Sequence, residues 1–265
     1  MLRLGLVQMR CEKADITGNL SIMEGYIAEA RLRHTDLVAF PEMCVTGYAD
    51  PLRQPEVCLD AEGPEVARLL TMTQGFDGTI LAGIIEASVR DKPFITQLVI
   101  RNGKMIGRYR KRTIAGDEAD RFSPGHEPFV FVHDGITCGV SICADIDNRS
   151  VFADCAKLGA TIVLECAAPG LYGEQATRNW QSGFEWWKGE CLNKMAHHAA
   201  TNNLWIGVST QAGRTVDEDF PGGGYLFSAT GENLYCASDY GEGVAWLEVD
   251  MDEHKVRCQN PASAR

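Results

Sequence analysis

Three side chains that could act together in amide hydrolysis stand at the ends of predicted strands. Glu42 comes directly after a short apolar run, Lys111 follows a strand that leaves a hairpin turn, and Cys143 ends another apolar run. Hydrolysis of an amide by a thiol needs a base for the thiol proton, a cation or N–H donors for the oxyanion, and a proton for the leaving amine. Glutamate, lysine and cysteine can together meet all of these needs.

Each of these residues also has an ordinary explanation when it is taken alone. Cys143 is one of ten cysteines, most of which we expect to be small buried side chains. Glu42 could be a carboxylate on a surface loop, and Lys111 belongs to the basic run 108–112, which would normally be solvated. No histidine stands at an equally good strand end, which disfavours a cysteine–histidine pair. The three residues therefore support the hypothesis only as a set.

Alternating strand and helix patterns must position this set. Strands are expected at 2–9, 36–40, 79–86, 97–100, 104–109, 129–133, 137–142, 161–164, 204–209, 224–228 and 245–249. Helices are expected at 19–33, 64–74, 149–158 and 184–201. Asn102 with Gly103, and Asp134 with Gly135, predict two hairpin turns. The pattern predicts a mixed α/β sandwich with functional residues at strand ends and in loops.

The composition favours a compact acidic protein that acts on small molecules. Hydrophobic residues make up 45% of the chain, and the formal net charge is -11. Such a charge repels nucleic acid and anionic membranes. No apolar stretch approaches the roughly 20 residues that a membrane span needs, and the first 15 residues turn polar too early for a signal peptide. We therefore expect one domain over residues 1–265, a cytoplasmic location, and neither a nucleic-acid nor a membrane partner.

The cysteine and histidine positions suggest neither a disulfide scaffold nor a metal site. The ten cysteines are scattered along the chain without a CxxC pair, so we expect reduced thiols. His197 and His198 are adjacent and cannot share a helix face as ligands. We expect no metal site, and the thiol mechanism requires no organic cofactor.

Several sequence blocks, in the same order, resemble the nitrilase superfamily of carbon–nitrogen hydrolases from residue 2 to about residue 250. The Leu-Gly-Leu-Val-Gln-Met run at 4–9 and the Asp-Leu-Val-Ala-Phe-Pro-Glu run at 36–42 resemble the family's first block, whose catalytic glutamate falls on Glu42. The Tyr-Arg-Lys-Arg-Thr-Ile run at 109–114 is similar to the family's tyrosine-x-lysine-x-histidine-leucine block. The catalytic lysine then falls on Lys111.

The later blocks continue the resemblance. Glu118 and the Phe-Ser-Pro-Gly run at 122–125 fit a block in which a second glutamate helps to position substrate and lysine. Residues 139–145 resemble the nucleophile block, glycine-x-x-isoleucine-cysteine-x-aspartate, with Cys143 at the nucleophile position. Further similarities lie at residues 159–164, 202–213 and 223–231.

The resemblance implies a fold, a reaction and a set of roles. The implied fold is a four-layer α-β-β-α sandwich that assembles at least as a homodimer. Glu42 would be the general base, Lys111 the oxyanion stabiliser, Cys143 the nucleophile and Glu118 a helper that positions substrate and lysine, with the backbone N–H of Ala144 as a second oxyanion donor. The implied substrate is a small amide or carbamoyl compound, cleaved through a cysteine thioester with release of ammonia or an amine.

Two departures from the family pattern leave the substrate open. Thr113 stands in the histidine slot, and residues 146–150 read Ile-Asp-Asn-Arg-Ser where many members carry Arg-Phe-Pro-Glu. We therefore expect an altered pocket wall, with Tyr48, Glu165 and Arg149 as candidate substrate contacts. An aromatic group follows the 166–175 loop, which the resemblance places near the pocket mouth, and would serve either the pocket or core and dimer packing. Its members are Trp180, Phe184, Trp186 and Trp187.

Other functions remain open at this point. A nitrile could enter the same machinery through a thioimidate, although no feature of the chain demands a nitrile. A binding protein could keep the fold and lose turnover, which the altered 146–150 run favours and the intact set of Glu42, Lys111 and Cys143 disfavours. A thiol redox sensor would lose activity only on oxidation and would not need Glu42. Acyl transfer to lipid is disfavoured because no membrane segment is expected.

Overall fold

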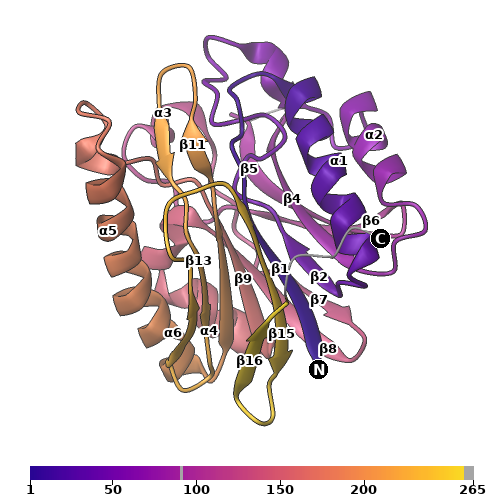
Figure 1. Ribbon diagram of the computed structural model, residues 1–265. Coiled ribbons are helices and arrows are strands. Elements are labelled where there is room, and N and C mark those ends of the chain that lie inside the picture. The colour runs from indigo at the N-terminus through magenta and orange to yellow at the C-terminus, as the bar shows by residue number, and fades with distance from the viewer. Residues whose placement is uncertain (90–91, 260–265) are drawn as a thin grey trace.

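Two β-sheets packed face to face form the centre of the protein (Figure 1). The computed structural model describes residues 1–89 and 92–259. The first sheet has eight strands, in the order β16 (Lys255–Cys258), β15 (Gly243–Asp250), β1 (Leu2–Gln8), β2 (Leu37–Ala39), β4 (Thr79–Glu86), β5 (Phe94–Arg101) and β6 (Lys104–Arg110), with β3 (Cys58–Leu59) beside β4. The second has six, in the order β14 (Asn233–Cys236), β13 (Gly224–Phe227), β10 (Trp205–Thr210), β9 (Ile162–Ala167), β8 (Ile136–Ile142) and β7 (Val130–His133).

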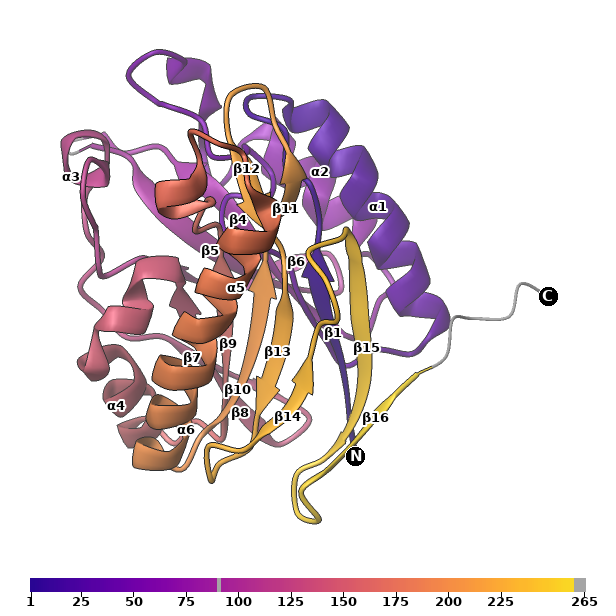
Figure 2. The same cartoon turned by 60° about the vertical axis from the view of Figure 1, so that its left-hand side comes forward.

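Helices cover the outer face of each sheet. On the first sheet lie α1 (Ile16–Leu32) and α2 (Pro64–Met72), and on the second lie α4 (Arg149–Lys157), α5 (Trp180–Glu190) and α6 (Ala196–Asn202) (Figures 1 and 2). Between α5 and α6 the chain forms one stretch of π-helix, η4 (Cys191–Met195). The layers therefore follow the order α-β-β-α, which confirms the predicted sandwich.

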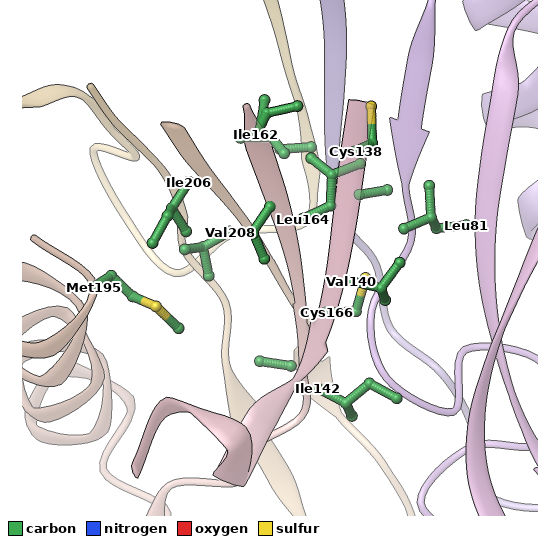
Figure 3. Close-up of a cluster of buried hydrophobic side chains, with 14 of the residues drawn as sticks. Leu81, Cys138, Val140, Ile142, Ile162, Leu164, Cys166, Met195, Ile206 and Val208 are labelled. Atoms are coloured by element: carbon green, nitrogen blue, oxygen red, sulfur yellow. The ribbon is translucent and has the colours of Figure 1, made fainter. Parts of the chain in front are cut away.

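The interior is divided by the sheets into packed apolar layers. Leu20, Met23 and Ile27 of α1 pack with the outer residues of the first sheet. Figure 3 shows the second sheet, with Met195 on its helical side and Leu81 of the first sheet across the inter-sheet core. Ser209 ties the sheets together, because its hydroxyl donates to the carbonyls of both Val7 and Ala39, at 2.5 and 2.9 Å. This packing fixes the relative position of strand ends from both sheets.

Local sequence signals explain the element boundaries. Side chains of asparagine or aspartate cap three helices, with Asp15 at α1, Asn148 at α4 and Asn179 at α5 each accepting a backbone N–H of the first turn. The two predicted hairpin turns are confirmed, because Asn102 has φ 48° and Gly103 φ 73°, as a type I′ turn requires. Asp134 and Gly135 repeat this geometry, with φ 45° and 83°.

Three parts of the chain differ from the expected elements. The helix expected at 184–201 begins four residues earlier, at Trp180 after the Asn179 cap, and is interrupted by η4. The strand expected at 161–164 runs on to Ala167, because β8 and β10 keep pairing with it on both sides. Short strands that the sequence analysis did not predict are β3, β14, β16 and the ribbon of β11 (Ala212–Arg214) and β12 (Asp219–Pro221).

Two whole-chain properties bear on the expectations about environment. Within residues 1–89 and 92–259, no helix combines the length and the apolar character that a membrane span demands. All ten cysteines are free thiols, as the scattered spacing predicted.

Candidate active site

Strand ends of the two sheets bring Glu42, Lys111 and Cys143 together. Glu42 follows β2 after Phe40 and Pro41, Lys111 follows β6, and Cys143 follows β8 as the first residue of the 3₁₀ helix η2 (Cys143–Asp147). Lys111 and Cys143 line one cavity of about 550 Å³, named here the Cys143 cavity. The structure thus assembles the three residues that the sequence analysis selected.

The Lys111 ammonium lies between two buried carboxylates. Its Nζ donates to Glu42 Oε1 at 2.8 Å and to Glu118 Oε1 and Oε2 at 2.8 and 3.0 Å. The exposed fraction is 1% for Lys111, 0% for Glu42 and 4% for Glu118. A buried ammonium is tolerated only with such partners, so this geometry explains why one member of the basic run points inward.

Burial and mutual attraction shift the pKa values of these groups. Burial raises the pKa of Glu42 to about 7, against the attraction of Lys111. Burial alone would lower the pKa of Lys111, but the attraction of Glu42, Cys143 and Glu118 outweighs it and the pKa is raised. Burial, with repulsion from Glu42, also raises the pKa of the Cys143 thiol well above its usual range. The resting site therefore holds a neutral thiol, a cationic lysine and a carboxylate that titrates near neutral pH.

Backbone contacts hold the Glu42 carboxylate in place. Its Oε2 accepts the backbone N–H of Ala168 at 3.0 Å, and Met43 beside it has the left-handed φ of 49°. Gly83 makes room for this turn, because a Cβ at Gly83 would lie 2.3 Å from the Met43 nitrogen. The Gln97 side chain donates to the Phe40 carbonyl at 3.1 Å. The base is thus fixed by both sheets.

The turn that carries Cys143 is held by Asp145. Cys143 itself has φ 45°, a left-handed conformation that costs energy for a residue with a Cβ. Asp145 Oδ2 accepts the Tyr109 hydroxyl at 2.7 Å and the Ile142 N–H at 3.1 Å, and Oδ1 accepts the Thr113 N–H at 2.8 Å. Asp145 therefore joins the nucleophile turn to the segment that carries Lys111.

Glu118 is fixed from three directions. Besides Lys111, it accepts the Tyr48 hydroxyl on Oε1 and the Ala115 N–H on Oε2 at 3.2 Å. It begins the one-turn helix α3 (Glu118–Arg121), which the sequence analysis did not predict. Glu118, Tyr48 and Ala144 all line the Cys143 cavity, so these three predicted residues lie with the nucleophile.

Two other predicted contacts lie outside the cavity lining. Arg149 is exposed and starts α4. Glu165 has an exposed fraction of 0% and lies within β9, directly across from Val208. Neighbours across a sheet share a face, and Figure 3 shows Val208 on the helical side, so Glu165 points under the helical layer. The strand expected at 161–164 ends just before Glu165, whereas β9 extends to Ala167 and keeps this side chain within the sheet.

Glu165 is a buried carboxyl group that lacks strong partners. Within residues 1–89 and 92–259, neither of its oxygens has a hydrogen-bond partner. Burial raises its pKa well above the usual range, and it outweighs the opposing effect of the Ser141 hydroxyl beside it on β8, which forms no hydrogen bond to Glu165. Burial thus favours the neutral form of the Glu165 carboxyl group in the folded protein.

The predicted aromatic group divides into two parts. Trp186 and Trp187 line the cavity, together with Tyr172 of the preceding loop, whose ring stacks on Trp186 at 4.9 Å. Trp180 and Phe184 instead contact Tyr240, the first by stacking and the second edge to face. The pocket explanation therefore applies to Trp186 and Trp187, whereas Trp180 and Phe184 pack against Tyr240 away from the cavity lining.

Several residues of the cavity were not predicted from the sequence. Ile146 and Asp147 belong to the run that departs from the family pattern, and they form part of the wall. Lys13, Glu190 and Glu218 reach the wall from segments far apart in the chain, and no local pattern marks them. Within the described ranges, no three histidine, cysteine, aspartate or glutamate side chains are grouped to hold a metal ion.

Comparison with curated proteins places this site in a family context. A family model described as carbon-nitrogen hydrolase matches residues 3–256. The glutamine-dependent NAD(+) synthetase of Acinetobacter baylyi is 24% identical over 269 residues, which cover 99% of this chain and 47% of that protein. A hydrolase of Mycobacterium tuberculosis is 26% identical over 278 residues, which cover 96% of this chain and 91% of that protein. The chain thus spans about half the length of the synthetases it matches.

Solved structures share the same fold. The NitN amidase of Nesterenkonia sp. AN1 superimposes with a TM-score of 0.80 at 18% identity, covering 96% of this chain and 95% of that one. The glutamine-dependent NAD+ synthetase of Acinetobacter baumannii gives 0.81 at 21% identity, covering 100% of this chain and 48% of that one. Because the family model matches nearly the whole sequence, the chain belongs to the carbon–nitrogen hydrolase family.

Proposed function

We propose that residues 1–265 act as one hydrolase domain that cleaves the carbon–nitrogen bond of a small amide or carbamoyl compound. One observation carries the proposal: a buried Lys111 ammonium is held between Glu42 and Glu118 beside the cavity that Cys143 lines. Such a set provides a base, an electrophilic cation and a nucleophile in one enclosed place. A purely structural ion pair would not need a cysteine in a strained turn next to it.

In the first half-reaction, the thiol adds to the substrate carbonyl. Glu42 accepts the proton of the Cys143 thiol while Sγ bonds to the carbonyl carbon, and the π electrons of the C=O bond move to oxygen. The Lys111 ammonium and the Ala144 N–H stabilise this oxyanion. A base that titrates near pH 7 suits this step, because the thiol pKa is raised and little free thiolate exists beforehand.

The first half-reaction ends when the leaving group departs, and in the second half-reaction the acyl group passes to water. The proton on Glu42 moves to the leaving nitrogen as the C–N bond breaks, so ammonia or an amine departs and a thioester of Cys143 remains. Glu42 then takes a proton from water, whose oxygen bonds to the thioester carbon. The S–C bond breaks, the proton returns to the Cys143 sulfur, and the acid is released. Glu118 holds Lys111 in position throughout.

A relative of the same fold supports this chemistry. In a glutamate-to-glutamine mutant of the Nesterenkonia amidase, which is 19% identical to this chain with a TM-score of 0.77, the acetamide moiety of fluoroacetamide is covalently added at the active-site cysteine. The (R)-stereoselective amidase of a Pseudomonas species is 28% identical over 164 residues, covering 62% of this chain and 59% of that protein. That adduct keeps its amide group, so it reports a nucleophilic cysteine, and the thioester at Cys143 is our own proposal.

The proposal is tested by intact mass and ammonia release. The protein is incubated with a panel of short amides, glutamine, carbamoyl compounds and nitriles, beside Cys143→Ala and the control Cys58→Ala, whose cysteine lies outside the cavity. We expect an adduct and ammonia with the wild type and Cys58→Ala, and neither with Cys143→Ala. Full turnover by Cys143→Ala would refute the nucleophile assignment. Turnover of nitriles alone would change the substrate class, and none at all would favour the binding-protein alternative.

We also propose a cytoplasmic location and an assembly of at least two copies. Ten free thiols fit a reducing compartment. The assembly follows from the family resemblance alone. Light scattering after gel filtration tests it, and a mass equal to one 29.1 kDa chain would contradict it.

A further inference from the structure

We propose that the Cys143 cavity selects amides whose acyl chain carries a cationic group, such as a primary ammonium. This inference rests on the proposed hydrolase function and names the substrate class of the same site. It depends on which charges in the cavity wall are already paired within the protein and which are left for a ligand.

The cations of the described wall are all neutralised by carboxylates of the protein. Lys111 is held by Glu42 and Glu118. Lys13 Nζ contacts Asp217 at 2.7 Å and Glu218 at 2.9 Å. The third cation is an arginine of α3, which pairs with the residue just before this helix. A substrate carboxylate entering this cavity would therefore find no uncommitted positive charge on the described side chains.

The third cation of the wall is Arg121, whose guanidinium contacts the Asp117 carboxylate at 2.7 Å. Numbers alone would not favour a cationic substrate, because an excess of carboxylates over cations in the wall matches the acidic composition of the whole chain. The charge that the cavity favours in a substrate follows from how these groups are paired. Every cation of the wall has at least one carboxylate partner in the protein, whereas some carboxylates of the wall share a single cation.

Asp147 and Glu190 are two carboxylates of the wall that share one cation from outside the wall. The Lys194 ammonium lies 2.6 Å from Asp147 Oδ1 and also contacts Glu190 Oε2. Both carboxylates line the cavity, Lys194 does not, and the remaining oxygen of each has no hydrogen bond or ion pair within the described part of the chain. The group therefore carries one net negative charge.

This group is within reach of an acyl chain bound at the nucleophile. Asp147 is four residues after Cys143 in the 3₁₀ helix η2, a rise of about 8 Å along the helix axis. A linear chain of a few carbons can span such a distance. The stacked rings of Tyr172 and Trp186 line the same cavity, and aromatic faces attract alkylammonium groups. The net negative charge of the group and the aromatic rings of the wall therefore favour the same ligand, an acyl chain that ends in an ammonium.

The test compares three amides of matched length. In 5-aminopentanamide the chain ends in an ammonium, in hexanamide a methyl group replaces it, and in adipamate a carboxylate replaces it. We expect kcat/KM for ammonia release to decrease in that order. Equal values for the three compounds, or a preference for adipamate, would overturn the inference while leaving the proposed hydrolase function intact.

A charge-reversing variant examines the assigned group. In Asp147→Asn/Glu190→Gln, Lys194 becomes the remaining charge of the group, so the kcat/KM ratio of 5-aminopentanamide to adipamate should fall about ten-fold, given about two- to five-fold per exposed carboxylate. The control Glu253→Gln removes a carboxylate from the exposed Lys255 pair outside the cavity and should keep the wild-type ratio. An unchanged ratio in the double variant would contradict the assignment.

Binding without turnover separates this inference from the proposed function. The three amides are titrated into the Cys143→Ala protein by calorimetry. Tighter binding of 5-aminopentanamide than of hexanamide supports the cationic class even if no amide is hydrolysed by the wild type, in which case only the hydrolase proposal fails. A different outcome would overturn the substrate class alone. In that outcome turnover depends on Cys143, but the three amides bind with the same affinity and are hydrolysed with the same kcat/KM.

Discussion

Replacing Glu165 by glutamine should stabilise the protein, and by an amount that grows with pH. The carboxyl group is fully buried without a hydrogen-bond partner in the described chain, and burial raises its pKa well above the usual value of 4.5. The folded state therefore keeps the proton while the unfolded state releases it above pH 4.5. Stability from this group is full below that pH and is lost as pH rises toward the folded pKa.

The magnitude follows from the linkage relation. Between the unfolded and folded pKa values, the wild-type free energy of unfolding falls by about 1.4 kcal/mol per pH unit because of this one group. Glutamine has nearly the same shape and does not ionise. The difference in unfolding free energy between Glu165→Gln and wild type should therefore increase from pH 5.5 to pH 7.5, by at most about 2.7 kcal/mol, which is the increase if the folded protein keeps the proton over this whole interval.

Urea denaturation at pH 5.5, 6.5 and 7.5 measures this difference. Other titrating groups are present in both proteins and cancel in the comparison. Glu24→Gln, on an exposed position of α1, reports any general effect of removing one acidic group. A difference between Glu165→Gln and wild type that stays constant with pH would refute the reasoning, since it would mean that Glu165 is ionised in the folded protein.

Three further substitutions examine the site itself. Glu118→Gln removes a charge that raises the Glu42 pKa, so the acid limb of kcat/KM, expected near pH 7, should move to lower pH; a lower rate with an unmoved limb would contradict this coupling. Tyr48→Phe removes a hydrogen bond to the Glu118 carboxylate. It should lower kcat/KM about ten-fold and the free energy of unfolding by about 1–2 kcal/mol. Wild-type kinetics in this variant would show that Tyr48 is dispensable. Asp145→Asn must turn its NH₂ toward at least one N–H or O–H donor and should cost about 1–3 kcal/mol in urea denaturation; unchanged stability would argue against the hydrogen-bond network.

The parts of the site that sequence reasoning found are those fixed by local pattern. Glu42 and Cys143 follow strands whose apolar runs are visible in the sequence, and a strand end fixes where the next side chain can lie. Lys111 needed the resemblance, because neighbouring arginines of the same run turn outward to Glu86 and nothing local distinguishes the inward residue. The four-layer fold likewise followed from the family resemblance, while the composition supported only a mixed α/β class.

The parts that were missed depend on contacts between distant segments. Lys13 and Glu190 reach the cavity because α5 and the segment before α1 pack near the nucleophile turn, a relation set by tertiary structure. The position of Glu165 depended on whether β9 ended at Leu164 or Ala167. Strand length is set by the partners on both sides, and period-2 side-chain alternation then decides which face each residue takes.

The second carboxylate on Lys111 explains how one buried cation can serve both halves of the proposed reaction. When Glu42 takes the thiol proton it becomes neutral, and a lysine paired with Glu42 alone would then lose its counter-ion in a buried site. Glu118 stays in contact with Lys111 and keeps the ammonium paired at that moment. The charge lost from Glu42 reappears on the oxyanion, so the net charge around Lys111 changes little. The cation is thus stabilised before, during and after proton transfer, which is the preorganisation that electrostatic catalysis requires.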